Sequence, residues 1–287
     1  MRLSSETTAV VLDSTADIPD PQARHPNWRL VPLYVRFGEE TFRDHVDLTP
    51  RAFYERLKAS REQPQTSQPT PADFQRAFEE LEGYEKILCL LISGRLSGTA
   101  ESARLAAEQT GDGRVTVFDS RSVCGQSILA ESIQRRLERG TDEAELEALV
   151  ERFRHEAGIL FTVDTLDYLV RGGRVGKAAG LAGELLSVKP ILAIRDGEVE
   201  PIKRVRGRTK SLAELEKIFT ESTTDSGALR IGVAHAADPA AAEDLLARMT
   251  AARPQATVEI AGAELGPVIG THGGPGTLGV FWFDDPE

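Results

Sequence analysis

The sequence predicts an α/β protein of two domains, a parallel α/β half followed by an α+β half. The chain has 287 residues, enough for about two domains, and its 40% hydrophobic and 28% charged content is ordinary for globular proteins. Apolar runs alternate with helical patterns as far as about residue 158, which is typical of a parallel sheet. Beyond that point the turn dipeptide Asp196-Gly197 joins two strand-like runs, which favours a hairpin and an α+β arrangement.

The first domain is expected to span residues 1–158. Its predicted strands are 9–12, 87–92 and 115–118, and its predicted helices are 71–81, 99–109 and 127–138. The first of these helices has the clearest start signal. Thr70 is the expected N-cap, Pro71 takes the first helical position, and Asp73 completes a capping-box pattern.

The second domain is expected to span residues 159–287, with a strand at 158–162 at the boundary. Its other predicted strands are the hairpin at 189–205 and the runs 229–234, 257–261 and 278–283. One helix is predicted over 239–249. Another should begin at Ser211, because Glu214 follows three residues later as in a second capping box.

The charge balance excludes one broad class of function. A net charge of −11 argues against general nucleic-acid binding, which requires a basic surface. Two acid-free basic runs therefore stand out, RGGRVGK at 171–177 and KRVRGRTK at 203–210. In so acidic a protein they favour an anionic partner surface or a phosphate. The longest apolar run, 87–92, is far shorter than the roughly 20 residues of a membrane-spanning helix.

Cysteine usage and the N-terminus both indicate a cytoplasmic protein. Cys89 and Cys124 are far apart and lack the spacing of metal ligands, so reduced, buried thiols are expected. Asp13 interrupts the N-terminal region before any apolar stretch of the signal-peptide type develops. No metal and no cofactor is predicted.

Hydroxyl side chains follow several predicted strands, at the edge where open α/β sheets hold their ligands. These residues are Ser14 and Thr15, Ser93 and Ser97, and Ser120, with Thr66 and Ser67 just ahead of another helix. Helix N-termini at this edge favour an anion, although serines and threonines also cap helices and turns for structural reasons alone. His272 stands among glycines that permit close approach, and the small residues of 178–188 allow either tight packing or an apolar slot.

Together, these segments resemble the signature of the DegV family, in order along most of the chain. The matching stretches are VVLDSTADIP, TSQPTPADF, SGRLSGTAESA, FTVDTLDYLVRGGRVG, KPIL, KRVRGRTK and GTHGGPGTLGV. The family is similar throughout to FakB proteins, the fatty-acid-binding subunits of a bacterial two-component fatty acid kinase. The resemblance implies two α/β domains with a long-chain fatty acid in a tunnel between them, and an acyl-chain slot in the second domain.

The resemblance also implies roles for individual residues. Thr66 and Ser97 would hold the carboxylate through neutral donors, with His272 near the same head group. Further candidates on the ligand loops are Ser67, Ser93, Gly98 and Thr99. Arg171, with Arg174 beside it, and one arginine of the second basic run would contact the kinase. Arg206 fits that last role because Val205 precedes it, with Arg204 as the alternative.

Such a protein would present its fatty acid to an ATP-dependent kinase partner, which forms the acyl phosphate, and would not be an enzyme by itself. The resemblance leaves room for transient contact with a membrane surface. Two other classes stay open. A hydrolase could use Ser97 with His272, but the chain lacks a Gly-x-Ser-x-Gly elbow and a clear third member. A carrier or regulator for another hydrophobic acid or lipid would fit the same motifs.

Overall fold

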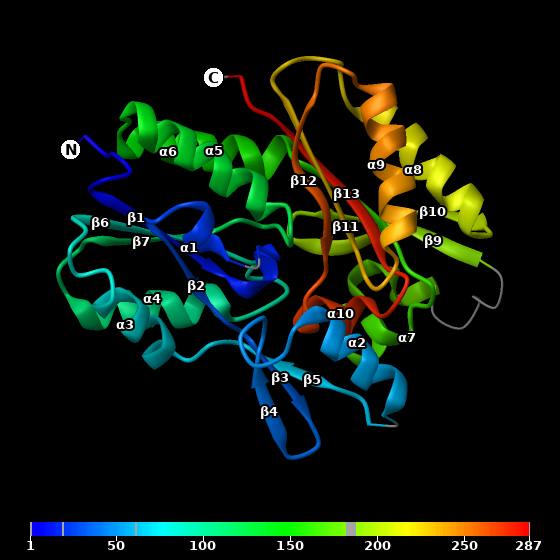
Figure 1. The fold of residues 1–287 in the computed structure, drawn as a ribbon, viewed down its shortest axis with the longest axis horizontal. Helices are drawn as coiled ribbons and strands as arrows, with labels where there is room; N and C mark the ends of the chain where they lie inside the picture. The colour runs from blue at the N-terminus through cyan, green and yellow to red at the C-terminus, as the bar shows by residue number, and fades with distance from the viewer. Residues whose placement is uncertain (1, 19, 61, 182–187, 287) are drawn as a thin grey trace.

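The computed structural model describes residues 2–18, 20–60, 62–181 and 188–286, and three β-sheets organise this part of the chain (Figure 1). The first sheet is parallel and has the order β2 (Trp28–Val31), β1 (Thr8–Asp13), β6 (Lys86–Leu91), β7 (Val115–Asp119). Every residue of β1 and β6 is buried, as expected for strands covered on both faces. The predicted parallel α/β half is confirmed.

Four helices cover the two faces of this sheet. They are α3 (Pro71–Glu79) and α4 (Thr99–Thr110) on one face, and α5 (Gln126–Arg139) and α6 (Glu143–Glu156) on the other. Alternate residues of β1 divide between the two layers, because successive side chains of a strand point to opposite faces. Ala9 and Val11 pack toward α3 and α4, whereas Val10 and Leu12 join the core beneath α5 and α6.

The second sheet has six strands and is mixed. Its order is β10 (Glu198–Arg206), β9 (Val188–Arg195), β8 (Gly158–Thr162), β13 (Leu278–Asp284), β11 (Leu229–His235), β12 (Thr257–Glu264). Only the β11–β12 pair is parallel among these described strands. Helices α8 (Arg208–Ser222) and α9 (Pro239–Ala252) pack against it in one apolar cluster. A second cluster contains α7 (Asp167–Arg171), the 3₁₀ helix η2 (Gly176–Leu181) and residues of β9 and β10. The predicted α+β half is confirmed.

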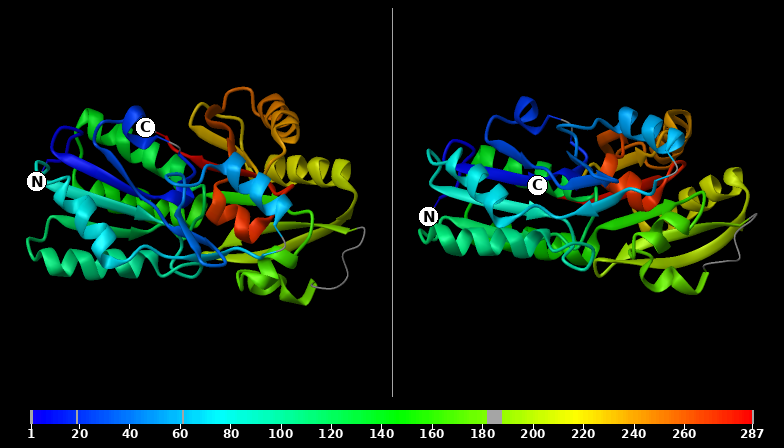
Figure 2. Two further views of the ribbon diagram at one scale, coloured as in Figure 1. Left: turned by 60° about the horizontal axis from the view of Figure 1, so that its bottom comes forward. Right: turned by 90° about the horizontal axis from the view of Figure 1, so that it is seen from below.

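A small antiparallel sheet, missed in the sequence, joins the two larger parts of the molecule. It has the order β4 (Glu40–Arg43), β3 (Tyr34–Phe37), β5 (Gln65–Ser67), and projects from the body of the protein (Figure 1). Strand β2 and helix α6 were also unpredicted, as were η1 (Ser14–Ala16), α1 (Pro21–Arg24), α2 (Pro50–Ala59) and α10 (Pro267–Gly273). Near the C-terminus, α10 packs against α2, β3 and β5, so the last tenth of the chain closes onto its first quarter (Figure 2).

The helix starts show where local signals succeed and fail. The capping box at Thr70 and Asp73 is confirmed, with both reciprocal hydrogen bonds present. The predicted start at Ser211 is wrong, because α8 begins three residues earlier, at Arg208. The Arg208 guanidinium donates to the Gly276 carbonyl and pairs with Asp238, which anchors the extra turn. Ser211 lies inside the helix and donates its hydroxyl to the Arg208 carbonyl.

The predicted domain boundary at residue 158 separates the strands of the two large sheets. The four-stranded sheet uses only strands before it, and the six-stranded sheet begins with β8. The boundary itself stays a prediction, because one apolar core contains residues of both parts, such as Leu12 and Phe283. Both cysteines are buried and neither forms a disulfide bond. Within the described ranges, no helix is long and apolar enough to cross a bilayer.

Candidate functional site

A cavity of about 440 Å³ lies where the two large sheets meet. The segments that follow β2, β6 and β7 supply one side, through Leu33, Ile92 and Cys124, because parallel strands end at a common edge. The six-stranded sheet supplies the other side, through residues such as Phe161 and Phe281. The cavity therefore lies between the halves of the protein, as the predicted fold requires.

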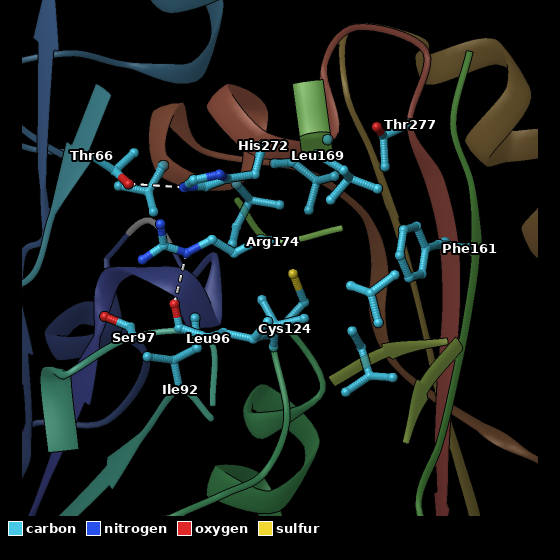
Figure 3. A pocket seen from close by; sticks show the side chains of 18 of the residues that line it. Thr66, Ile92, Leu96, Ser97, Cys124, Phe161, Leu169, Arg174, His272 and Thr277 are labelled. Atoms are coloured by element: carbon cyan, nitrogen blue, oxygen red, sulfur yellow. Dashed lines mark hydrogen bonds between the residues drawn. The ribbon is translucent and has the colours of Figure 1, made fainter. Parts of the chain in front are cut away.

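Most polar side chains of the lining gather at one end of the cavity, whereas Thr277 lies toward the other end (Figure 3). Thr66 and His272 point toward each other there, Ser97 lies opposite them, and Arg174 reaches between the two groups. Gln68 and Ser67 belong to the same lining. The rest of the wall is mainly aliphatic and aromatic. An elongated apolar ligand with one polar end would match this distribution.

Thr66 and His272 are brought together by packing between segments that are far apart in the chain. Thr66 lies on β5, opposite Val35 of β3, and His272 lies in the last turn of α10. The Thr66 hydroxyl oxygen and His272 Nε2 are 2.8 Å apart, across 206 positions of sequence. This hydrogen bond fixes the direction of the hydroxyl group at the polar end of the cavity.

The imidazole of His272 is neutral at pH 7. Burial, together with the nearby positive charge of Arg174, lowers its pKa to about 4. Its Nδ1 is buried and has no hydrogen-bond partner among the described residues. The backbone of Gly172 packs directly on this ring, and a Cβ at that position would lie only 2.1 Å from Nδ1. A glycine is therefore needed there for the ring to keep its place.

Ser97 lies in the turn between β6 and α4. Its hydroxyl shares a hydrogen bond of 2.8 Å with the hydroxyl of Thr99, the first residue of α4. Gly98 is the N-cap of this helix and provides no side-chain cap, so the helix N-terminus is available to an anion. The Gln68 side chain covers Gly98 so closely that a Cβ there would lie 2.2 Å from its amide oxygen.

Arg174 is the cation at this end of the cavity. Its Nε donates to the Leu96 carbonyl at 3.0 Å, and one terminal nitrogen donates to the Gly172 carbonyl at 2.8 Å. These bonds hold the guanidinium beside the predicted carboxylate site. The sequence had grouped Arg174 with the kinase-docking arginines, and no signal in the basic run distinguishes a cavity-lining arginine from a surface one.

The remaining predicted residues lie outside the immediate polar cluster. Ser93 is buried and donates to the Gly197 carbonyl at 2.8 Å, so its hydroxyl joins the two halves. Thr99 is also buried, and contacts the site through Ser97. Arg171 is exposed at the end of α7, and Arg204 and Arg206 are exposed on β10. Most of the predicted acyl-chain slot, residues 182–187, lies outside the described residues.

Comparison with known proteins supports a single family. A family model described as "Uncharacterised protein, DegV family" matches residues 7–285. A DegV domain-containing protein of Deinococcus radiodurans is 38% identical over 274 residues, covering 95% of this chain and 96% of its own.

Two solved structures share the fold over nearly their whole length. One is described as fatty acid binding of a DegV family protein from Thermus thermophilus, at 36% identity and a TM-score of 0.89, covering 97% of this chain and 99% of that one. The other is the Streptococcus pneumoniae fatty acid kinase B3 protein loaded with linoleic acid, at 25% identity and a TM-score of 0.84, covering 97% and 100%. On the family match and these identities, the chain belongs to the DegV family.

Proposed function

We propose that this protein binds a long-chain fatty acid in the cavity, with the carboxylate at the polar end. One observation carries the proposal: a largely apolar cavity gathers Thr66, Ser97 and His272 at one end. Burial of each methylene group contributes about 0.8 kcal/mol, so the apolar walls supply most of the affinity. The fatty acids named with the Thermus and Streptococcus relatives support this ligand class.

The polar end supplies donors for both carboxylate oxygens. The hydroxyls of Thr66 and Ser97 would each donate to the carboxylate, with His272 Nε2–H donating to the Thr66 oxygen and the Thr99 hydroxyl donating to the Ser97 oxygen. Arg174 adds a positive charge at the same end. The expected set of neutral donors is therefore extended by a guanidinium, and we assign Arg174 to the head group in place of the docking surface.

The bound acid would be presented to a separate ATP-dependent kinase, which transfers the phosphoryl group to it. The exposed arginines Arg171, Arg204 and Arg206 are the proposed docking residues, since they lie on the surface of the second half. The likeness to the Streptococcus kinase B3 protein supports such a partner. The protein would hold and orient the substrate without catalysing its reaction.

The arrangement of Ser97 does not favour the alternative of a serine hydrolase. Its hydroxyl bonds Thr99, whereas His272 Nε2 bonds Thr66. Among the described residues, no hydrogen bond joins Ser97 to His272, so the serine has no base positioned to activate it.

The test is to identify the lipid and to measure what it does. Native mass spectrometry of the purified protein should show a bound acid of roughly 14 to 18 carbons, held by burial of its methylenes. Restoring the acid to delipidated protein should raise the melting temperature, since a ligand at about 100 times its Kd adds about 2.7 kcal/mol of stability. Acyl phosphate should form only when kinase and ATP are added. A protein without stoichiometric lipid, whose melting is unchanged by added acids, would disprove the proposal.

A further inference from the structure

A second cavity, of about 380 Å³, lies behind the wall of the first. Ile159 of β8 and Ile194 of β9 line both cavities, so one pair of side chains separates them. The second cavity is far more polar. Its lining combines the loop after β7, the end of α6, the ends of β8 and β9, and the end of α8.

Three arginines line this second cavity, namely Arg121, Arg154 and Arg195. Arg154 is held in place, since its Nε donates to the Asp119 carbonyl at 2.8 Å and it also pairs with Glu151. Arg121 and Arg195 are exposed, and their side chains have no hydrogen bond or ion pair within the described part of the chain. Two arginines are thus available to a ligand in a protein whose net charge is −11.

The acidic side chains of the same lining do not cancel this charge. Glu156 is engaged by Arg152, with 3.0 Å between a guanidinium nitrogen and a carboxylate oxygen. Asp196 is exposed at the turn of the β9–β10 hairpin, next to Arg195. The arginines therefore outnumber the acids that face them, and the excess is positive.

The two available arginines come from different halves of the protein. Arg121 follows β7 and has a φ of 51°, an uncommon conformation for a residue with a side chain. The hairpin turn packs on this loop, since a Cβ on Gly197 would lie 3.6 Å from the Arg121 Cα. Ser93, donating to the Gly197 carbonyl, fixes the same contact. An anion bound by Arg121 and Arg195 would bridge the halves beside this contact.

The inner part of the cavity offers an apolar surface. The Ser122 side chain is buried, and its hydroxyl has no hydrogen-bond partner among the described residues. Trp282 and Ile218 line the same cavity and would contact an organic group.

We propose that this second cavity binds a small organic phosphate. The phosphoryl oxygens would accept hydrogen bonds from Arg121 and Arg195, because the guanidinium fork matches phosphate geometry. The organic group would lie against Trp282 and Ile218. This site is separate from the head-group end of the first cavity, with which it shares none of the residues Thr66, Ser97, Arg174 or His272.

Occupancy of the two cavities should be thermodynamically coupled. A ligand in either cavity contacts Ile159 and Ile194, whose side chains form the common wall. If the organic phosphate changes the affinity for fatty acid, the fatty acid must change the affinity for the phosphate by the same factor. This coupling rests on the proposed function, whereas the anion site does not.

The test uses adenosine monophosphate and inorganic phosphate as probes, with delipidated full-length protein at low salt. Calorimetry should give a Kd for adenosine monophosphate of about 1 mM or tighter. The double variant Arg121→Gln, Arg195→Gln should bind at least about tenfold more weakly, a loss of about 1.4 kcal/mol. Arg51→Gln is the control, because Arg51 lies on the exposed face of α2, in a pair with Glu55. If adenosine monophosphate does not bind, or if the double variant and the Arg51→Gln control lose affinity equally, the proposed site is overturned.

Binding measurements on the same proteins also test the role of the apolar residues and the coupling between the two cavities. Equal affinity for inorganic phosphate and adenosine monophosphate would overturn the role given to Trp282 and Ile218. In the wild-type protein, the affinity for palmitate should change when adenosine monophosphate is added. In the double variant, adenosine monophosphate should leave the affinity for palmitate unchanged. If the nucleotide does not change the affinity for palmitate in wild type either, the coupling is overturned. If adenosine monophosphate binds but palmitate does not, the proposed fatty-acid function fails, the coupling fails with it, and the anion site stands.

Discussion

At the scale of single residues, the polar end of the cavity depends on a few hydrogen bonds made by uncharged groups. Thr66 is oriented by neutral His272, and Ser97 by Thr99. Each hydroxyl has one hydrogen atom to donate, so its bond to a protein neighbour decides where that hydrogen points. The affinity for a carboxylate should therefore respond to changes that remove only one oxygen atom.

Thr66→Val and Ser97→Ala should each weaken fatty-acid binding by about 1–3 kcal/mol, the cost of leaving a buried charged acceptor short of a donor. Both changes nearly preserve side-chain volume, so the melting temperature of delipidated protein should change little. Fluorescence displacement measures the affinity. Thr220→Val is a matched control, since Thr220 is exposed on α8 and its hydroxyl donates to the Glu216 carbonyl. Unchanged affinity in both cavity variants would place the carboxylate elsewhere.

A second residue-scale feature is a group of buried carboxyl groups beneath α10. Burial raises the pKa of Asp44 to about 7 and that of Asp13 to about 6, although His45 beside Asp44 opposes part of the shift. Asp44 accepts a long hydrogen bond of 3.4 Å from the Val268 N–H, and its second oxygen has no partner among the described residues. Its charged form is therefore poorly stabilised.

Asp44→Asn should become more stabilising, relative to wild type, as pH rises from about 4 to about 7. In that window folded Asp44 keeps a proton that the unfolded chain releases, so its contribution to stability falls with rising pH. An asparagine cannot ionise, and so does not lose this stability. Thermal melting at about pH 5 and pH 8 measures the difference, with exposed Asp112→Asn as control. An equal change in melting temperature at both pH values would contradict the assignment.

At the scale of elements, the site depends on the close approach of α7 and α10. Two glycines permit it, because the Gly172 backbone packs on the His272 ring and Tyr168 covers Gly274. A Cβ on Gly274 would lie 2.2 Å from the Tyr168 ring, and its φ of 74° also favours glycine. The position of the imidazole is therefore set by how two short helices meet.

Gly172→Ala should lower fatty-acid affinity by about tenfold, because the added methyl group displaces the imidazole and with it the Thr66 hydroxyl. Gly180→Ala in the nearby η2 is the control, since a Cβ there meets no atom of the described residues within 4 Å. Affinity and melting temperature are measured for both variants. Equal affinities would show that the ring position is not critical for binding.

At the scale of the whole molecule, the ligand and the kinase would use different surfaces. The cavity lies between the halves, whereas Arg171 and Arg206 are exposed and make no side-chain hydrogen bond or ion pair within the described ranges. A change of charge at these arginines should therefore reduce presentation of the fatty acid to the kinase and leave binding of the fatty acid unchanged.

Arg171→Glu and Arg206→Glu should leave fatty-acid affinity and melting temperature near wild type. Acyl-phosphate formation with the cognate kinase should fall steeply, because loss of a desolvated interfacial charge typically costs about 2–5 kcal/mol. The control is the charge reversal Arg51→Glu at an exposed position. The wild-type reaction should also slow as the salt concentration rises, because salt screens the attraction between the two charged surfaces. If the variants lose both fatty-acid affinity and acyl-phosphate formation, or lose neither, these arginines do not dock the kinase.

What the sequence determined by itself was local. The capping box at Thr70, the continuous apolar runs of β1 and β6 and the hairpin turn at Asp196-Gly197 are set by neighbouring residues, so they were predictable.

Thr66, Ser97 and His272 were singled out by their motifs, but only the tertiary structure decided their contacts. The Thr66–His272 bond spans 206 positions, and the guanidinium of Arg174 is held at the cavity by the distant backbone carbonyl of Leu96. The start of α8 was likewise moved by a long-range contact of Arg208. Such contacts depend on how packed elements meet in space, which short-range patterns do not encode.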